Sequence, residues 1–418
     1  MRLKDISILS PRFSGHNNED TVAFVPMECL REDAIEQKEI TIEEGSAKYT
    51  FFADNDLLIA KVTPCFENGN IAVAKNLKGG IGFGSSEIFV LRFNKHINPR
   101  YMFYLTKSTS FQDKACATMC GVGGLKRISP LIMRTYEADF PLLDKQNSIV
   151  AYLDKQIKTI NKRIELKEKE LQSITRLKQS IINSAITNGL NSPVQMKDSG
   201  IQWIGNIPSH WDILRLKDVS YLYNGLTGKA GDDFRCDDPT LTKPFIPFTN
   251  ILNNTIIDFS NFKKVVMSSG EYQNQVQEND ILFLMSSEDY DSIGKTAIVI
   301  GDPGEVYLNS FCRGLRFTNK KKVFPKFVNY LLLSDKYRNA LRLEARGFTR
   351  INLKIDKISS LTIAIPPFNE QKDIVAYIDD KCNRIEDITS NLSMQIEKLK
   401  LLKKALINEV ITGQRSIK

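Results

Sequence analysis

Gln146-Asn-Ser-Ile-Val-Ala-Tyr-Leu-Asp154 occurs twice in this 418-residue chain, the second time as Gln371-Lys-Asp-Ile-Val-Ala-Tyr-Ile-Asp379. The match continues without a gap, at a constant offset of 225, as far as Ile186-Thr187 and Ile411-Thr412. No Pro or Gly occurs between Gln146 and Asn188, and good helix formers are dense there. Both copies are therefore predicted to be long helices.

Each predicted helix carries one apolar stripe that steps alternately by three and four residues. The stripe runs through Ile157, Ile160, Ile164, Lys167, Leu171, Ile174, Lys178, Ile181 and Ala185, and its twin through Cys382, Ile385, Thr389, Leu392, Ile396, Leu399, Lys403, Leu406 and Val410. This shared heptad frame predicts that the two helices pack on each other. The alternative is a helix packed on its own domain, but at ~1.5 Å per residue the first helix would be about 65 Å long, longer than a small domain is wide. The polar members of the stripe are expected either to set the register of the pair or to mark where the seam opens toward partner subunits.

The globular parts of the chain are repeated as well. Arg2-Leu-Lys-Asp-Ile-Ser7 returns as Arg215-Leu-Lys-Asp-Val-Ser220, Asn55-Asp-Leu-Leu58 as Asn279-Asp-Ile-Leu282, and Leu91-Arg-Phe93 as Leu315-Arg-Phe317. Short β-like runs separated by turns are predicted at 23–27, 57–62, 71–74 and 88–93, and again at 245–249, 280–284, 296–300 and 312–317. A helical patch follows each set, at 100–117 and 325–342, and the glycines at 79–84 are predicted to form a turn between strands.

These patterns predict an α+β fold with a pseudo-two-fold internal repeat. The predicted parts are a first globular domain at 1–142, a central helix at 143–190, a linker at 191–210, a second globular domain at 211–367 and a C-terminal helix at 368–414. Trp203 and Trp211 are expected to pin the linker, which is rich in Gly, Pro, Ser and Asn. The two globular domains have diverged between their shared framing residues, as expected of two domains that bind different ligands.

Composition places few limits on function. The chain is 42% hydrophobic and 25% charged, and none of its apolar runs approaches the ~20 residues of a membrane span, so a cytoplasmic protein without membrane contact is expected. The seven cysteines are scattered and fit a reducing compartment. A net charge of +8 is compatible with a nucleic-acid partner but does not demand one.

Each stretch that resembles part of a catalytic or metal-binding motif lacks other residues that the motif requires. Gly294-Lys-Thr296 resembles the end of a phosphate-binding loop, but position 289 is Asp where that loop needs Gly. Asn98-Pro-Arg-Tyr101 is similar to the Asn-Pro-Pro-Tyr of adenine methyltransferases but lacks the second Pro, and a helix that starts after Pro99 explains it equally well. Cys116 and Cys120 lie one helical turn apart without a second pair of ligands, so two half-buried thiols are expected rather than a zinc site. No catalytic residue, metal or cofactor is predicted for this chain.

Several stretches together resemble the specificity subunit of type I restriction-modification systems. They are the repeated Gln-x-x-Ile-Val-Ala-Tyr-[Leu/Ile]-Asp openings, the lead-in Pro366-Pro-Phe-Asn-Glu-Gln371, and Lys197-Asp-Ser-Gly-Ile-Gln-Trp-Ile-Gly-Asn-Ile-Pro-Ser-His-Trp211. In the first domain, Val25-Pro-Met-Glu28, the stretch from Asp56 to Gly69, and Gly121-Val-Gly-Gly-Leu-Lys-Arg127 look like a common class of target recognition domain. The resemblance covers nearly the whole chain. One departure is Leu142-Leu-Asp-Lys-Gln146, where the family usually has Pro-Pro-Leu-x-Glu-Gln.

The resemblance implies two tandem target recognition domains held apart by an antiparallel coiled coil, each recognising one half of a split, asymmetric site in double-stranded DNA. It also implies two docked adenine-N6 methyltransferase subunits and, optionally, two ATP-driven restriction subunits. The methyl donor, magnesium and ATP would belong to those partners. Two modules on one rigid spacer would fix the distance between half-sites.

The expected DNA contacts lie in basic turns at matching places in the two domains. Lys126 and Arg127 in the first domain, and Arg346 and Arg350 in the second, are predicted to bind phosphates or bases. Lys61, Arg313 and Lys321, within the run Lys320-Lys-Lys322, are weaker candidates. For all of these residues, the alternative is ordinary solvated loop charge.

Two other functions compete with DNA recognition by a non-catalytic subunit. One is a single-chain DNA methyltransferase or nuclease with duplicated domains, which the incomplete donor, phosphate and metal motifs disfavour. The other is a coiled-coil scaffold that never contacts DNA.

Overall fold

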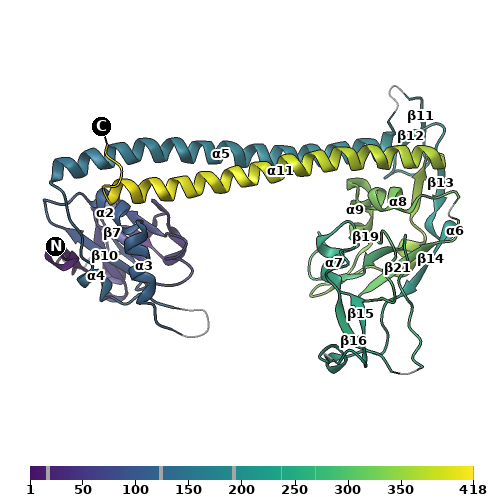
Figure 1. Ribbon diagram of the computed structural model, residues 1–418, viewed down its shortest axis with the longest axis horizontal. Coiled ribbons are helices and arrows are strands. Elements are labelled where there is room, and N and C mark those ends of the chain that lie inside the picture. Colours follow the sequence, from purple (N-terminus) through teal and green to yellow (C-terminus); the bar gives the residue numbers. More distant parts are fainter. Residues whose placement is uncertain are drawn as a thin grey trace. The chain divides into compact units, whose positions relative to one another are not determined.

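The computed structural model describes residues 1–15, 19–121, 126–190, 194–236, 238–268, 270–319 and 321–417. The chain divides into two compact units, unit 1 with residues 1–169 and 392–418, and unit 2 with residues 170–391. Each unit contains part of the long helix α5 (Leu143–Asn188) and part of the long helix α11 (Phe368–Ile411) (Figure 1). The fold is mixed α/β, as the sequence predicts.

Unit 1 contains two four-stranded sheets. The first has the order β1-β10-β7-β8 and is antiparallel throughout, with Leu57 of β7 opposite Leu91 of β10. The second has the order β5-β2-β9-β6, and its pair β2–β9 is parallel. The strands of unit 1 are β1 (Ser7–Leu9), β2 (Thr21–Val25), β3 (Leu30–Arg31), β4 (Ala34–Ile35), β5 (Lys38–Thr41), β6 (Thr50–Ala53), β7 (Leu57–Ala60), β8 (Ile71–Val73), β9 (Ile81–Gly84) and β10 (Ile88–Phe93).

Unit 2 repeats this plan. Its main sheet has the order β14-β21-β17-β19, and its second sheet, β16-β15-β20, again includes one parallel pair, β15–β20. Its strands are β11 (Met196–Asp198), β12 (Asn206–Pro208), β13 (Asp212–Arg215), β14 (Ser220–Asn224), β15 (Thr242–Ile246), β16 (Lys263–Val266), β17 (Ile281–Leu284), β18 (Ser286–Ser287), β19 (Thr296–Ile298), β20 (Tyr307–Leu308), β21 (Cys312–Phe317), β22 (Ile351–Asn352) and β23 (Thr362–Ile365).

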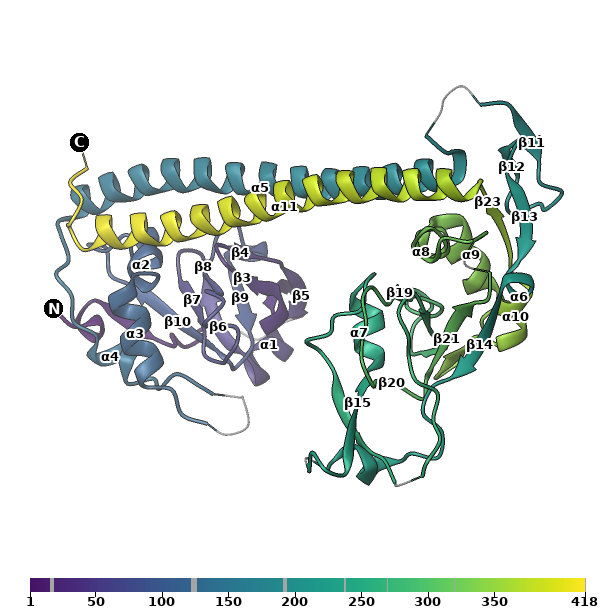
Figure 2. The same ribbon diagram turned by 45° about the vertical axis from the view of Figure 1, so that its right-hand side comes forward.

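Short helices cover the sheets of both units. In unit 1 they are η1 (Leu3–Asp5), η2 (Met27–Cys29), α1 (Ile42–Lys48), η3 (Lys78–Gly80), α2 (Pro99–Thr106), α3 (Thr109–Ala117) and α4 (Ile132–Thr135). In unit 2 they are α6 (Leu216–Val219), η4 (Gly231–Phe234), α7 (Phe248–Asn253), α8 (Pro325–Leu333), α9 (Asp335–Glu344) and α10 (Ile355–Ser359). Helix α2 packs against β7 and β8, and α8 packs against β19 (Figure 2).

Two local predictions need correction. Each predicted helical patch is two helices, because Ser108 and Ser334 adopt extended backbone angles that interrupt them, and the Ser108 side chain caps α3 by accepting a hydrogen bond from the amide of Phe111. The glycine stretch 79–84 is only partly a turn, since Ile81–Gly84 is strand β9 in the second sheet. Within the linker, β11 and β12 form an antiparallel pair.

The tryptophans hold the linker as predicted. Trp211 is buried, and its Nε1 donates a hydrogen bond to Glu370 Oε1 at 3.2 Å, at the start of α11. The Trp203 ring makes an edge contact with Tyr337, with the ring centroids 4.9 Å apart. Both contacts lie within unit 2.

The predicted seam between the long helices is confirmed within each unit. In unit 1, Ile157 and Ile160 of α5 share a core with Leu406 and Val410 of α11. In unit 2, Ala185, near the end of α5, shares a core with residues from the first part of α11. The N-terminal part of α5 thus packs on the C-terminal part of α11 and the reverse, which makes the coiled coil antiparallel (Figures 1 and 2). All the stripe positions are buried or half-buried.

Candidate functional site

The repeated glutamine that opens each long helix joins that helix to its globular domain. Gln146 is buried, and its Oε1 accepts a hydrogen bond from the amide of Asn98 at 2.8 Å while its Nε2 donates to the carbonyls of His96 and Pro141. Gln371 repeats this with the amide of Phe324 at 2.7 Å and the carbonyls of Lys322 and Pro366. The anchor is therefore the same in both units, although the Pro-Pro lead-in is missing before Gln146.

The aspartate that ends each repeated motif makes a second anchor. Asp154 Oδ1 accepts hydrogen bonds from the Tyr104 hydroxyl at 2.6 Å and from the Arg100 guanidinium at 2.8 and 2.9 Å. In unit 2, Asp379 accepts from Tyr330 at 2.7 Å and from the Lys326 ammonium at 2.6 Å. Burial, reinforced by the carboxylate, raises the pKa of both tyrosines, so each remains a protonated donor.

An ion pair between a buried carboxylate and a half-buried arginine crosses the main sheet in each unit. The carboxylate of Asp56, on the turn before β7, is 1% exposed and accepts two hydrogen bonds from Arg92 of β10, at 2.7 and 2.8 Å. Asp280 and Arg316 repeat this geometry at 2.7 and 2.9 Å. The internal sequence repeat included both residues of each pair, but it was not used to predict that they contact each other. The equal offset between the aspartates and between the arginines could have indicated it.

Three predicted contact residues of unit 1 lie close together near the end of β7. Arg127 forms an isolated bridge with Val62, and the amide of Ile128 donates to the carbonyl of Lys61 at 2.9 Å. The backbone of Lys126 pairs with Thr63, and its side chain is exposed. Residues 122–125 of the predicted turn lie outside the described residues.

Arg127 and Lys61 already have partners in unit 1. The Arg127 guanidinium contacts Glu87 with nitrogen-to-oxygen distances of 2.9 to 3.2 Å, and these hydrogen bonds raise the pKa of Arg127 and lower that of Glu87. The Lys61 ammonium donates to the carbonyl of Ser86 at 2.6 Å and lies 4.7 Å from the centre of the Phe89 ring; burial lowers its pKa. Lys126 is therefore the most available cation of the three. Sequence reasoning missed Glu87, which has no counterpart acid in unit 2.

The equivalent place in unit 2 gathers arginines and aromatic rings. The Arg350 guanidinium stacks 4.4 Å from the centre of the exposed Phe311 ring, and Phe311 directly precedes β21 just as Glu87 directly precedes β10. Arg346 is exposed and donates to the carbonyls of Leu343 and Ala345. Arg313 is half-buried and donates to the carbonyls of Ser310 and Cys312, and burial lowers its pKa.

The lysine run lies elsewhere in unit 2. Lys321 is exposed in the turn before α8, and Lys322 lies 3.5 Å from the carboxylate of Asp212; Lys320 is outside the described residues. This turn follows the far end of β21, which lies about 13 Å from Arg313 at ~3.3 Å per residue. The structure therefore groups Arg313, Arg346 and Arg350 and leaves Lys321 apart.

Two polar residues of the helix seam form specific ion pairs. Lys178 reaches across to Glu386 of α11 at 2.7 Å within unit 2. Lys403 leaves the seam and contacts Glu32 of the globular part of unit 1 at 3.0 Å. Lys178 therefore fits the register role, whereas Lys403 ties the helix to its own domain.

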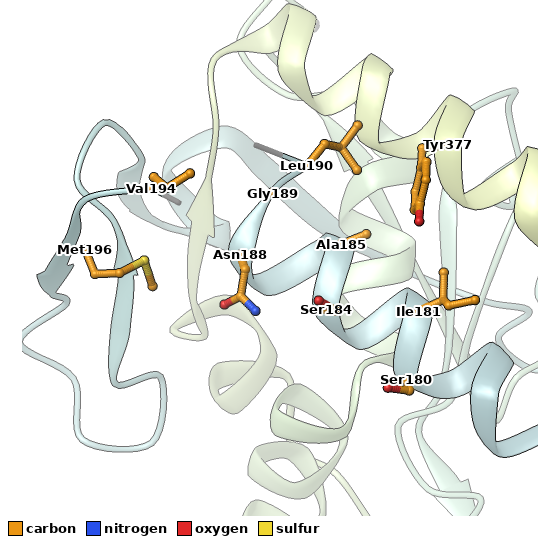
Figure 3. Close-up of a pocket in the computed structure, with 10 residues that line it drawn as sticks. All are labelled: Ser180, Ile181, Ser184, Ala185, Asn188, Gly189, Leu190, Val194, Met196 and Tyr377. Carbon is orange, nitrogen blue, oxygen red and sulfur yellow. The ribbon is translucent and has the colours of Figure 1, made fainter. Parts of the chain in front are cut away.

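The end of α5 borders a cavity of about 690 Å³ in unit 2. Figure 3 shows Ile181 and Ala185 of α5 on one side and Tyr377 of α11 on another. Leu190, Met196 and Tyr377 are each more than a third exposed. Its lining mixes the polar side chains of Ser180, Ser184 and Asn188 with apolar ones and includes no group of titratable side chains that would suit a reaction.

The described residues hold no cluster of three or more His, Cys, Asp or Glu that could bind a metal ion. Asn98 caps α2, since its Oδ1 accepts a hydrogen bond from the amide of Arg100 at 2.8 Å, with Pro99 in the first turn. This is the helix start that competed with a methyltransferase motif. Cys116 and Cys120 are exposed rather than half-buried, and they do not share a helix, since α3 ends at Ala117. Among the described residues, no helix is both long and apolar enough to span a membrane.

Residues 208–398 match the family model described as type I restriction modification DNA specificity domain. The type I restriction enzyme EcoEI specificity subunit of Escherichia coli is 35% identical over 158 residues, 37% of this chain and 26% of that protein. The MjaVIII specificity subunit of Methanocaldococcus jannaschii is 24% identical over 406 residues, 94% of this chain and 86% of that protein. For EcoEI the match thus spans about a quarter of the relative's length.

Solved structures resemble the fold over nearly the whole chain. A chain from a study of assembly and conformational transition of the type I R-M system matches with a TM-score of 0.75 at 15% identity, over 99% of this chain and 97% of that one. The HsdS subunit of Thermoanaerobacter tengcongensis matches with a TM-score of 0.54 at 15% identity, over 99% and 96%. These likenesses establish the two-domain fold with its helical coiled coil.

Proposed function

We propose, from the premise that this chain belongs to the family of type I restriction-modification specificity subunits, that it is the non-catalytic DNA-recognition subunit of such a complex. Residues 1–142 and 211–367 are the two target recognition domains, and each binds one half of a bipartite, asymmetric site in double-stranded DNA. Its location is then the cytoplasm, together with that DNA.

One observation carries the proposal: the same main sheet presents different side chains at the same place in the two units. Arg127 meets the carboxylate of Glu87 in unit 1, whereas Arg350 meets the Phe311 ring in unit 2. The anchoring glutamines, aspartates and cross-sheet ion pairs are shared. A common frame with different exposed groups suits two modules that recognise different base sequences.

We assign the phosphate and base contacts to Lys126 and Arg127 in the first domain and to Arg346, Arg350 and Arg313 in the second. Arg127 can reach DNA only by leaving Glu87, so it is suited to a contact made on specific binding. Lys61 donates a hydrogen bond to the carbonyl of Ser86, so its role is to position the turn that contains Ser86. Lys321 lies away from these groups and is suited to a backbone phosphate only.

The long helices have two roles in this proposal. They set the spacing between half-sites, and their outer faces dock two methyltransferase subunits and, in a restriction complex, two restriction subunits. Exposed apolar side chains support docking, because they lie outside the seam on α5 and α11. They are Leu166, Leu177, Tyr377, Ile388, Met394, Leu401 and Leu402. The methyl donor, magnesium and ATP are held by those partners, and this chain needs no cofactor.

The decisive experiment is to co-express the chain with its methyltransferase subunit and map methylated adenines by long-read sequencing. A split motif is expected, and replacing residues 1–142 with the first domain of another specificity subunit should change one half of that motif only. The matched control replaces residues 211–367, which should change the other half. Absence of a split motif, or a motif that survives both replacements, would overturn DNA recognition by this chain.

A second measurement tests the non-catalytic assignment. The purified chain alone, incubated with DNA and labelled methyl donor, should transfer no label. Turnover would establish the competing function, a single-chain methyltransferase.

A further inference from the structure

The loop between α9 and α10 of unit 2 carries a fully exposed phenylalanine, Phe348. Phe348 has a relative exposure of 105%, so its ring contacts almost nothing in the folded unit. A single exposed apolar residue is common on protein surfaces. Its surroundings make this one unusual.

The base of the loop is tightly held. Arg346 and Asn352 pair through two backbone hydrogen bonds of 3.0 and 2.8 Å, and Ile351 pairs with Ser287 of β18. Gly347 has φ +145°, and a Cβ at this position would lie 2.0 Å from the carbonyl oxygen of Arg350. Only glycine fits this close approach, so the loop has a defined path that presents Phe348 outward.

The groups around Phe348 suit a polyanion with aromatic bases. Arg346 and Arg350 flank it in sequence, and the stretch from Ala345 to Ile355 contains no acidic residue. Arg350 stacks on Phe311, and the Tyr290 hydroxyl donates to the carbonyl of Gly347 at 3.4 Å. Both of these rings are more than a third exposed. Cations beside exposed rings match nucleic acid better than an apolar protein surface, which would leave the arginines without counter-charge.

We propose that Phe348 is an apolar wedge that inserts between adjacent base pairs of the half-site bound by unit 2, while Arg346 and Arg350 bind the flanking phosphates. This inference rests on the proposed DNA-recognition function and adds the residue that distorts the DNA. An inserted ring unstacks one base step, and proteins that bend DNA use such wedges to bring more of their surface into contact with it.

The wedge belongs to one half-site only. The equivalent turn of unit 1, between Cys120 and Arg127, has the sequence Gly-Val-Gly-Gly-Leu-Lys without an aromatic residue. The two half-sites should therefore differ in shape as well as in base sequence. Pyrimidine–purine steps unstack most easily, so the half-site of unit 2 is expected to place one at the wedge.

The test uses the full chain in complex with its methyltransferase subunits and duplexes that contain the mapped motif. One 2-aminopurine, which fluoresces when unstacked, is placed at a different position of the unit 2 half-site in each duplex of a series. Wild-type complex is expected to raise the fluorescence at one step. Phe348→Ala should abolish that rise and weaken specific binding by about tenfold to a hundredfold, with non-specific binding unchanged because the arginines remain.

Two further variants isolate insertion from other effects. Phe348→Leu keeps an apolar wedge and should retain part of the fluorescence rise. Tyr272→Ala removes another aromatic residue of unit 2, 89% exposed, and should behave as wild type. The wedge would be overturned, with DNA recognition intact, if the wild-type complex bound specifically without a rise in 2-aminopurine fluorescence. It would also be overturned if the Phe348→Ala complex kept that fluorescence rise. Loss of the methyltransferase subunits from the Phe348→Ala complex would also overturn it, in favour of a protein contact. If wild-type complex binds no split motif, the proposed function itself fails and the wedge with it.

Discussion

Replacing Gln371 with alanine should strongly destabilise unit 2. The side chain is fully buried and joins α11 to the turn before α8 and to the end of β23 through three hydrogen bonds of 2.7 to 2.9 Å. Alanine leaves the amide of Phe324 and the carbonyls of Lys322 and Pro366 without this partner. Each lost hydrogen bond costs about 1 kcal/mol, and about 1–3 kcal/mol where the abandoned group stays buried. Since Pro366 is buried and the other two are half-buried, we expect about 3–5 kcal/mol in total.

Tryptophan fluorescence during urea unfolding is a suitable assay. The chain has two tryptophans, Trp203 and Trp211, and both lie in unit 2, so the signal reports on that unit. With a urea dependence of about 2–3 kcal/mol per molar, the midpoint should fall by about 1–2 M.

Two alanine variants serve as controls for Gln371→Ala. Gln172→Ala, at an exposed position of α5 in the same unit, should change stability by less than about 0.5 kcal/mol. Gln146→Ala removes the equivalent anchor from unit 1 and should affect the tryptophan transition less than Gln371→Ala does. A loss below about 1 kcal/mol for Gln371→Ala would refute the argument that this glutamine fastens the helix to the domain.

Three further outcomes are expected. Hydrogen bonds from Lys229 lower the pKa of Glu271 to about 2, from an ordinary value of 4.5; its contribution to the stability of unit 2 should therefore be complete above pH 4.5 and be lost as the pH falls toward 2. In the Glu271→Gln variant, the urea midpoint should depend less on pH between pH 4.5 and 2 than in the wild type. A measured pKa near 4 for the Glu271 carboxyl would contradict the prediction. In thiol labelling of the native protein, Cys116 should react and the buried Cys312, whose pKa burial raises, should not; mass spectrometry of the labelled peptides checks this, and equal labelling would contradict the fold of β21. Inserting four residues at equivalent points of α5 and α11 should lengthen the gap in the methylation motif, whereas one heptad inserted in α5 alone should mismatch the seam and lower complex stability; an unchanged gap after the double insertion would show that the helices do not set the spacing.

Sequence reasoning found the framework of the site more completely than its exposed groups. The helix seam and the repeated glutamine and aspartate could be predicted because a heptad stripe and a constant offset are local, one-dimensional signals. Strands β5, β6 and β9 of the second sheet in unit 1 were missed, since they are short and one contains two glycines. No local sequence pattern indicated that residues far apart in the chain, such as Glu87 and Arg127, would be in contact.

By itself the sequence determined that this chain is a duplicated α+β protein with two long helices, and which residues begin and line those helices. Helix periodicity depends on residues three or four positions apart, so it can be recognised in the sequence without knowledge of the fold. Only the tertiary structure decided what each predicted arginine contacts: Arg127 contacts Glu87, and Arg350 contacts the Phe311 ring. Those partners come from a different segment of the chain, and sheet pairing alone brings them together.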